Sequence, residues 1–302
     1  RVWGHDAAYC EEIEATRENR KYLPGVKIPD GILFGADIAT LAADADTVFS
    51  VIPTQFLRTT LQSLQEHLPP RALYVTCSKG FERNTLELPS RIIQSCFDSA
   101  GIAVLSGPSH AEETSRGLPT TVVVASEDDA LSAKIQQIIS TDTFRVYSSS
   151  DARGVEVAGA SKNVIALAAG ISDGLGYGDN ARAALVCRGA TEITRLGAAL
   201  DCGREAFSGL SGIGDLVATC TSTHSRNHKV GYRIGQGETL DDILSSSEKV
   251  AEGVETTRSM HQLAEKISVE LPITTEVYRV LFENKPPRQA VGDLMGRELK
   301  RE

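Results

Sequence analysis

Short apolar runs alternate with amphipathic segments through the first half of this sequence, and this alternation constrains the fold most strongly. The runs are rich in β-branched residues and almost continuously hydrophobic, as is typical of strands covered on both faces of a sheet. In the segments between them, apolar residues repeat every three or four positions. Such strand–helix–strand alternation predicts a parallel α/β sheet. The predicted strands are 47–52, 72–76, 102–105, 121–124 and 144–147, and predicted helices lie at 55–67 and 130–139.

The pattern changes near residue 148. Beyond it we find no convincing strand, and long Ala- and Gly-rich segments have helical periodicity. We therefore predict an α/β domain at 1–148 and an all-helical domain at 149–302. Ligands of such chains bind at the carboxyl ends of the strands, in the cleft between domains. The helices predicted in the second half are 161–171, 181–200, 255–266 and 274–283.

Charge and cysteine content exclude several functional classes. The chain has 31 Lys and Arg against 40 Asp and Glu, and this acidic balance disfavours a nucleic acid as partner. No apolar run approaches the ~20 residues that span a bilayer, so we expect no integral membrane segment. The six cysteines lack zinc-like spacing, which predicts free thiols, no metal site and a cytoplasmic protein. Cys77 and Cys187 lie in apolar stretches and are expected to be buried.

Lys162 is a candidate proton carrier because it lies in a long apolar segment with helical periodicity. Burial lowers the pKa of a lysine toward neutrality, where acid–base catalysis is most effective. The local pattern alone leaves open a surface lysine whose aliphatic stem covers apolar surface. Small residues around Lys162 are expected to let other groups approach this helix, and they are Gly154, Ala158, Ala166 and Gly170.

Ser225, Arg226 and Asn227 form a candidate anion site at the start of a helix. Serine is a preferred N-cap residue, and the free N–H groups of a helix N-terminus attract anions. The guanidinium of Arg226 is a planar fork that suits phosphate oxygens. Taken alone, these residues fit an ordinary capped and solvated helix equally well.

Asp215 ends a glycine-rich run, 209–215, that differs from a dinucleotide-binding loop because no strand precedes it and its glycine spacing is wrong. Its glycines are expected to let the backbone approach a ligand. Asp215 is a candidate acceptor for hydrogen bonds from substrate hydroxyls or from Lys162. Thr219, one helical turn later, is expected to share its face.

Two further groups follow predicted strands, at the edge where ligands bind in such sheets. Lys79 follows the strand at 72–76, and the adjacent glycine gives its cation room to approach a ligand. Gly107 follows the next strand and has no side chain there. Ser109 is expected to cap the helix after it.

These motifs, in order and at compatible spacing, resemble the bacterial-type NAD(P)-dependent glycerol-3-phosphate dehydrogenases. The resemblance implies a Rossmann-type parallel sheet domain followed by an all-α, 6-phosphogluconate-dehydrogenase-like domain. It also implies interconversion of sn-glycerol 3-phosphate and glycerone phosphate with NAD or NADP, in support of glycerophospholipid synthesis. The motifs are Trp3-Gly-His-Asp6, Cys77-Ser-Lys-Gly80, Leu105-Ser-Gly-Pro-Ser109, Ser161-Lys-Asn-Val164, Ile171-Ser-Asp-Gly174, Gly212-Ile-Gly-Asp-Leu216, Ser225-Arg-Asn227 and Val250-Ala-Glu-Gly253.

The resemblance assigns roles residue by residue. It implies that Lys162 is the proton acceptor for alcohol oxidation. The implied substrate contacts are Lys79, Gly107, Ser109, Lys162, Asn163, Asp215, Ser225, Arg226 and Asn227, with Thr219 matching only the related eukaryotic enzymes. The implied cofactor contacts are His5, Lys79, Ala111, Arg226, Val250 and Glu252. His110 stands where relatives often carry Phe, a departure with no deducible consequence.

The main departure from the family is at the N-terminus. Relatives carry a G-x-G-x-x-G/A loop about 30 residues before the W-G-H-D segment, and this loop binds the pyrophosphate. The chain starts at Arg1 without it, which predicts that an N-terminal strand and loop are missing from the sequence. A catalytically silent scaffold or dinucleotide sensor therefore stays open as an alternative. A β-hydroxy-acid dehydrogenase is disfavoured because it would lack the S-R-N site.

Two properties stay open at this stage. His5 followed by Asp6 fits either NADP or NAD, because a cation suits the 2′-phosphate and a carboxylate suits the 2′-hydroxyl. The expected partner is a phosphorylated small molecule, and a homodimer is possible.

Overall fold

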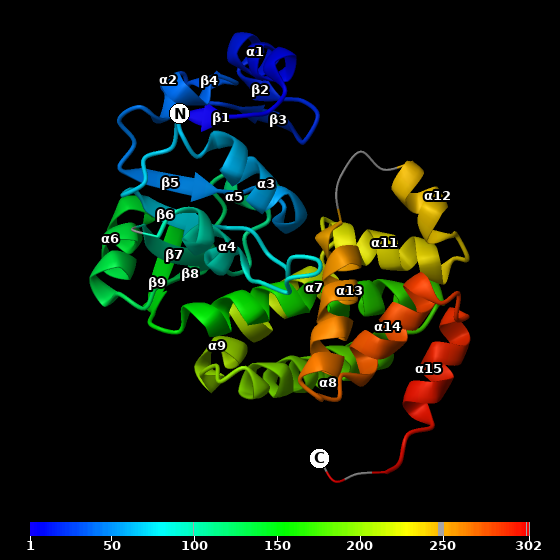
Figure 1. The fold of residues 1–302 in the computed structure, drawn as a ribbon. Coiled ribbons are helices and arrows are strands. Elements are labelled where there is room, and N and C mark those ends of the chain that lie inside the picture. The colour runs from blue at the N-terminus through cyan, green and yellow to red at the C-terminus, as the bar shows by residue number, and fades with distance from the viewer. Residues whose placement is uncertain (99, 247–250, 300, 302) are drawn as a thin grey trace.

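The computed structural model describes residues 1–98, 100–246, 251–299 and 301. The chain forms an α/β unit followed by a helical unit (Figure 1). This confirms the predicted fold class. None of the described helices combines the length and the apolar character needed to cross a lipid bilayer.

A five-stranded sheet forms the centre of the α/β unit, and all five predicted strands are present. Its spatial order is β5-β6-β7-β8-β9. The strands are β5 (Thr47–Ser50), β6 (Leu73–Thr76), β7 (Gly101–Ser106), β8 (Thr120–Ala125) and β9 (Phe144–Ser149).

The expectation of a wholly parallel sheet is wrong at one position, because β8 pairs with β7 in the antiparallel sense. A parallel pair is usually joined by a crossover that is built around a helix packed on one face of the sheet. The connection from β7 to β8 contains only the four-residue helix α5 (Ala111–Thr114), and the chain reverses direction there. The other pairs of this sheet are parallel.

Helices cover both faces of this sheet, which explains its continuously apolar strands. Tyr74 of β6 faces a core cluster that includes Leu57 and Ile92. Its neighbour Val75 points to the opposite face, where it joins Ile135. The covering helices are α3 (Thr54–Leu64), α4 (Pro89–Cys96) and α6 (Asp129–Ile139).

Residues 1–42 form a smaller unit beside β5 (Figure 1). It contains two two-stranded ladders, neither of which hydrogen-bonds to the five-stranded sheet among the described residues. Its elements are β1 (Val2–Trp3), α1 (Ala7–Thr16), β2 (Glu18–Asn19), β3 (Leu23–Lys27), β4 (Phe34–Gly35) and α2 (Ile38–Ala42), with β1 parallel to β4 and β2 antiparallel to β3.

Helix α7 (Ala152–Gly174) runs through the centre of the helical unit, with most of its residues buried. A helix that is apolar all round must be covered on every side, and Figure 1 shows the other helices arranged around it. They are α8 (Asp179–Ala199), α9 (Arg204–Ser208), the π-helical turn η1 (Leu210–Gly214), α10 (Asp215–Thr221), α11 (Arg226–Gly235), α12 (Leu240–Ser245), α13 (Glu252–Lys266), α14 (Pro272–Phe282) and α15 (Pro287–Met295).

Glycines bring α7 and α11 into backbone contact. A Cβ on Gly170 would lie 2.1 Å from the carbonyl oxygen of His228, and one on Gly231 would lie 2.1 Å from that of Leu167. The predicted close approach at Gly170 is therefore confirmed. This contact places the start of α11 beside the middle of α7, where the candidate site residues Lys162 and Asn163 lie.

Candidate active site

Lys162 is buried in the middle of α7, with 6% of its surface exposed. Its ammonium donates to Oδ1 of Asp215 at 2.5 Å and to Oγ1 of Thr219 at 2.7 Å. These contacts rule out the alternative of a surface lysine. They also agree with the expectations that Asp215 accepts from Lys162 and that Thr219 shares its face.

Asp215 binds a second lysine with its other oxygen. Lys79, in the loop after β6, donates from Nζ to Oδ2 of Asp215 at 2.7 Å. Gly80 has φ +134, a conformation that side chains rarely adopt, and Thr54 donates to the Lys79 carbonyl at 3.1 Å. The loop is thus held so that the two lysines flank one carboxylate.

Burial and the neighbouring charges give the two lysines different pKa values. Burial lowers the pKa of Lys162 to about 8, with Lys79 adding to the effect and Asp215 opposing it. Burial also works against the charge of Lys79, but Asp215 outweighs it and raises the pKa of Lys79. Burial would raise the pKa of Asp215, yet the two cations hold it below its usual value. Of the two lysines, Lys162 is therefore the one whose pKa lies closer to neutrality.

The hydroxyl of Thr219 directs the Lys162 amine. It donates its single hydrogen to the main-chain oxygen of Asp215 at 2.6 Å, so toward Lys162 it can only accept. A neutral amine has two hydrogens and one lone pair. If the amine donates one hydrogen bond to Asp215 and the other to Thr219, its lone pair is left to accept a proton from another molecule.

Asn163, next to Lys162 on α7, forms a second buried group. Its Oδ1 accepts from Nδ2 of Asn227 at 2.9 Å. Oδ1 of Asn227 accepts from the N–H of Gly253 at 2.9 Å. This chain of bonds ties α7, α11 and α13 together, and it brings the predicted Asn163 and Asn227 side by side.

The predicted anion site lies at the N-terminus of α11. Ser225 caps the helix by accepting from the N–H of His228 at 3.2 Å, as expected. Arg226 occupies the first helical position and is exposed, so its guanidinium is accessible to solvent.

Glu252, at the start of α13, is partly buried, and the loss of solvent raises the pKa of its carboxyl group. Its carboxylate accepts a hydrogen bond from the Thr54 N–H and interacts electrostatically with Lys79, Arg226 and Lys162. Without the family resemblance, the sequence around Glu252 predicts a solvent-exposed turn. The fold shields this residue partly from solvent because α13 packs against α7.

Gly107 and Ser109 lie in the loop after β7. Gly107 has φ +137, and a Cβ there would lie 3.0 Å from the Cα of Val122. The expectation that Ser109 caps the next helix is wrong, because its hydroxyl donates to the Gly107 carbonyl instead. Helix α5 begins one residue too late for that role, with His110 at its N-cap.

Of three further predicted cofactor contacts, two are exposed and one cannot be placed. His5 is exposed at the end of β1, and Ala111 is exposed at the start of α5. Val250 lies outside the described residues.

The glycine-rich run before Asp215 was predicted to let the backbone approach a ligand, but Gly212 has a different role. A Cβ there would lie 2.1 Å from the carbonyl oxygen of Phe207, so the close approach is to the chain's own backbone. The π-helical turn η1 makes this contact. It fixes where α10 begins and hence where Asp215 points.

Sequence reasoning missed two residues near the lysine pair. His110 is half buried, and burial together with nearby Lys162 lowers its pKa. Gly159 lies one turn before Lys162 on α7, and a Cβ there would lie 2.6 Å from the Ser106 hydroxyl and 3.8 Å from Lys79. The four-residue spacing of small residues did not include Gly159, so only the packing identifies it.

Two family models match most of the chain. One, described as NAD-dependent glycerol-3-phosphate dehydrogenase N-terminus, matches residues 1–132. The other, described as the C-terminus of the same enzyme, matches residues 151–292. The chain belongs to the NAD-dependent glycerol-3-phosphate dehydrogenase family. The family predicted from the ordered motifs is thereby confirmed.

Individual relatives agree with this membership. The glycerol-3-phosphate dehydrogenase (NAD(P)+) of Chlorobium phaeobacteroides (strain BS1) is 47% identical over 305 residues, covering 100% of this chain and 91% of that protein. The enzyme of the same name from Geobacillus kaustophilus (strain HTA426) is also 47% identical, covering 100% and 89%. These matches do not support the predicted truncation.

A solved structure of the family has the same fold. The crystal structure of glycerol-3-phosphate dehydrogenase from Coxiella burnetii superimposes with a TM-score of 0.94 at 33% identity, covering 98% of this chain and 91% of that one. Glycerol-3-phosphate dehydrogenase from Saccharomyces cerevisiae gives a TM-score of 0.81 at 26% identity, covering 98% and 89%.

The coenzyme of this glycerol-3-phosphate dehydrogenase family is NAD or NADP, and part of the site fits it. A partly buried carboxylate, Glu252, and a cation, Lys79, lie near the carboxyl ends of the parallel strands, where dinucleotides bind in such sheets. The described residues contain no glycine-rich turn from a strand into a helix for the pyrophosphate. No group of three or more His, Cys, Asp or Glu side chains among them is arranged to hold a metal ion.

Proposed function

We propose that this chain is an NAD(P)-dependent oxidoreductase that interconverts sn-glycerol 3-phosphate and glycerone phosphate. The observation that carries the proposal is the buried Lys162 and the partly buried Lys79 on one carboxylate, with only Lys162 having its pKa lowered to about 8. An alcohol–ketone interconversion needs one group that moves a proton and a cationic environment that stabilises the oxygen. Family membership supplies the substrate and the coenzyme class.

Lys162 is the proposed proton carrier. In the oxidation direction, its neutral amine takes the proton of the substrate's secondary hydroxyl. In the reduction direction, its ammonium returns a proton to the carbonyl oxygen. NAD(P), when bound, accepts or supplies the hydride at the same carbon.

The neighbouring residues hold the substrate in this scheme. Lys79 remains positively charged and stabilises the negative charge that develops on the oxygen, while Asp215 keeps both lysines in place. Asn163 contacts the substrate from α7. Gly107, Ser109 and Thr219 complete the proposed substrate contacts from their own elements.

The phosphate is proposed to bind at the start of α11. The N–H groups of this first turn and the Arg226 guanidinium together suit a phosphate dianion. Ser225 caps the turn, and Asn227 connects it to Asn163 at 2.9 Å.

We propose that residues 1–148 bind the cofactor and residues 149–302 bind the substrate and carry the proton-transfer residue. The cofactor contacts proposed are His5, Lys79, Ala111, Arg226, Val250 and Glu252. Glu252 links the two domains in this arrangement, because its carboxylate accepts from the Thr54 N–H of α3 while the residue itself begins α13.

Three broader properties are proposed from the same observations. The phosphorylated product serves glycerophospholipid synthesis, as in the resemblance from which the function was predicted. The protein works in the cytoplasm, in line with six cysteines that are all unpaired. It functions as a homodimer.

The direct test is to incubate the purified chain with glycerone phosphate and either NADH or NADPH and to follow loss of the reduced coenzyme. We expect oxidation that depends on glycerone phosphate and not on dihydroxyacetone, which lacks the phosphate. The alternative, a silent scaffold or dinucleotide sensor, predicts no turnover with either coenzyme. Coenzyme binding without turnover would therefore overturn the proposal.

A further inference from the structure

Asp173, near the end of α7, has no part in the proposed reaction, yet its side chain is only 12% exposed. It accepts hydrogen bonds from α8 and α11, two helices that pack against α7 (Figure 1). From α8, Arg182 donates with Nε to both oxygens at 3.2 Å and with Nη2 to Oδ1 at 3.0 Å. From α11, Nε2 of His228 donates to Oδ2 at 2.8 Å, because a carboxylate only accepts. Asp173 therefore joins three helices.

His228 is the third residue of α11 and belongs to the turn where the substrate phosphate is proposed to bind. Its N–H donates to the Ser225 hydroxyl at 3.2 Å, and its ring, which is 16% exposed, donates to Asp173. Its carbonyl oxygen lies so close to α7 that a Cβ on Gly170 would be 2.1 Å away. His228 is thus held at its N–H, its carbonyl and its ring.

The same turn has a second anchor on α7. Nδ2 of Asn227 donates to Oδ1 of Asn163 at 2.9 Å. Asn163 and Asp173 are ten residues apart, which corresponds to about 15 Å along a helix. Two anchors at this spacing fix both the position and the rotation of the turn. Arg226, the remaining residue of the turn, is exposed, so the anchors of its neighbours set where its side chain starts.

A carboxylate near an anion site repels the anion unless a cation compensates it. Arg182 supplies this cation to Asp173. We propose that Asp173 is a positioning residue for the phosphate: through His228 it holds the first turn of α11 so that the N–H groups and Arg226 meet the phosphate of the substrate. The inference rests on the phosphate site of the proposed function and adds to it the residue that orients this site.

The sign of the effect on KM distinguishes positioning from the alternatives. If Asp173 acted only through its charge, removing the charge would favour the phosphate and lower KM. If its role were only structural, removing it would reduce stability and the active fraction, and so kcat, without a change in KM. Positioning predicts that KM for glycerone phosphate rises while kcat changes far less.

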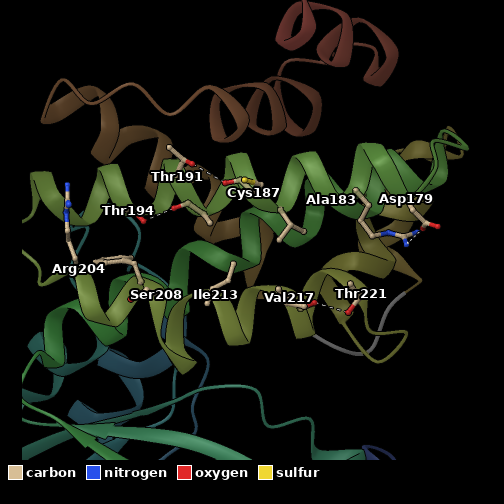
Figure 2. A pocket seen from close by; sticks show the side chains of 14 residues that line it. Asp179, Ala183, Cys187, Thr191, Thr194, Arg204, Ser208, Ile213, Val217 and Thr221 are labelled. Atoms are coloured by element: carbon tan, nitrogen blue, oxygen red, sulfur yellow. Dashed lines mark hydrogen bonds and ion pairs between the residues drawn. The ribbon is translucent and has the colours of Figure 1, made fainter. Parts of the chain in front are cut away.

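The first experiment compares Asp173→Ala with the native chain. It measures KM for glycerone phosphate and, by calorimetry without coenzyme, the Kd of glycerol 3-phosphate. Both are expected to rise about tenfold, as for the loss of a hydrogen bond to a charged group. Arg182 keeps its bond to Asp179 at 2.9 Å in this variant, so the change leaves no unpaired cation (Figure 2). An unchanged or lower KM overturns the proposal.

Asp179→Ala is the matched control. It removes the other carboxylate that binds Arg182, and the Asp179 side chain is 94% exposed. Asp179 does not hold the turn in the proposed arrangement, so KM and Kd should stay at their native values. A rise equal to that of Asp173→Ala would show that the charge balance of Arg182 matters rather than the position of α11, and would contradict the proposal.

The second experiment tests whether Asp173 acts through His228. His228→Ala should raise KM to the same extent as Asp173→Ala, and the double variant should be no worse than either, because one link is removed in all three. His228→Gln keeps an amide donor near the place of Nε2 and should retain most of the native affinity. Additive effects overturn the proposal. Equal KM values in His228→Ala and His228→Gln also overturn it, and this comparison stands even if Asp173→Ala fails to fold.

The two measurements separate this inference from the proposed reaction. If Arg226→Ala raises KM but Asp173→Ala does not, the inference is contradicted and the reaction is supported. If the chain binds glycerol 3-phosphate in a manner that depends on Asp173 but turns over with neither coenzyme, the reaction is contradicted and the inference is supported.

Discussion

Lys162 and Asp215 are 53 positions apart in the sequence, yet the Lys162 ammonium donates to Oδ1 of Asp215 at 2.5 Å inside the protein. The other oxygen of the same carboxylate binds Lys79. This shared carboxylate gives the two lysines different proton affinities, because Lys79 keeps its charge and burial lowers the pKa of Lys162 to about 8. The predictions below follow from this relationship and from the packing that maintains it.

The pH dependence of turnover should follow Lys162. In glycerol 3-phosphate oxidation the amine must be neutral, so kcat/KM should rise with pH and level off above about 8. In glycerone phosphate reduction the ammonium is needed, so the rate should fall above about the same pH. Steady-state rates in both directions check this. Profiles with the same slope in both directions would contradict the assignment.

Substitutions at the two partners of Lys162 should move this profile in opposite directions. Asp215 raises the pKa of Lys162, so Asp215→Asn should shift the rising limb to lower pH. Lys79 lowers the pKa of Lys162, so Lys79→Met should shift the limb to higher pH. Both variants lose activity, but the direction of the shift is independent of that loss. Parallel shifts would show that the two groups do not act on Lys162.

Arg226→Ala should mainly raise KM for the phosphorylated substrate. A hydrogen bond to a charged group contributes about 1.5–3 kcal/mol, which corresponds to a loss of roughly tenfold to a hundredfold. Lys229→Ala, also exposed on α11, is the control. If KM is unchanged in Arg226→Ala while Lys79→Met raises it strongly, the phosphate lies elsewhere in the site.

Gly231→Ala should destabilise the protein, because its Cβ would lie 2.1 Å from the Leu167 carbonyl oxygen. Overpacking a buried contact costs about 1–3 kcal/mol. Gly292→Ala in α15 meets no atom within 4 Å and should stabilise the fold by up to about 1 kcal/mol. Urea unfolding of both variants measures the difference. Equal stability would mean that α7 and α11 are not in backbone contact.

Buried Glu156 should make stability depend on pH. It accepts from the N–H and hydroxyl of Ser90 at the start of α4, and burial raises its pKa from 4.5 to about 7. The folded state therefore holds the proton more tightly, and stability should decrease as pH rises between these values, then level off. Glu156→Gln should remove this dependence, whereas Glu66→Gln on the surface should not. Equal slopes would contradict the role of Glu156.

Local sequence patterns could predict the elements that depend on local forces. The five strands follow from continuous β-branched runs, and the burial of Lys162 follows from its apolar neighbours. The antiparallel β8 could not be predicted, because the reversal depends on a link that contains only the short helix α5 rather than on the strand itself.

Long-range contacts and exposed apolar faces were beyond the local patterns. Lys79 and Asp215 are 136 positions apart, and no local pattern indicates that they meet. Cys187 was expected to be buried, and this is wrong because it lies exposed on α8. A helix face of small apolar residues predicts a buried position. The local pattern is the same whether or not another part of the chain covers that face.

The most direct test of the central claim is the kcat of Lys162→Ala with and without added primary amines. Removal of a general acid–base group costs about 10²- to 10⁴-fold in rate. The account predicts a loss of this size, with KM for glycerone phosphate changing far less, and a partial recovery that increases with methylamine concentration. An unchanged kcat in Lys162→Ala would contradict the proposal that this lysine moves the proton.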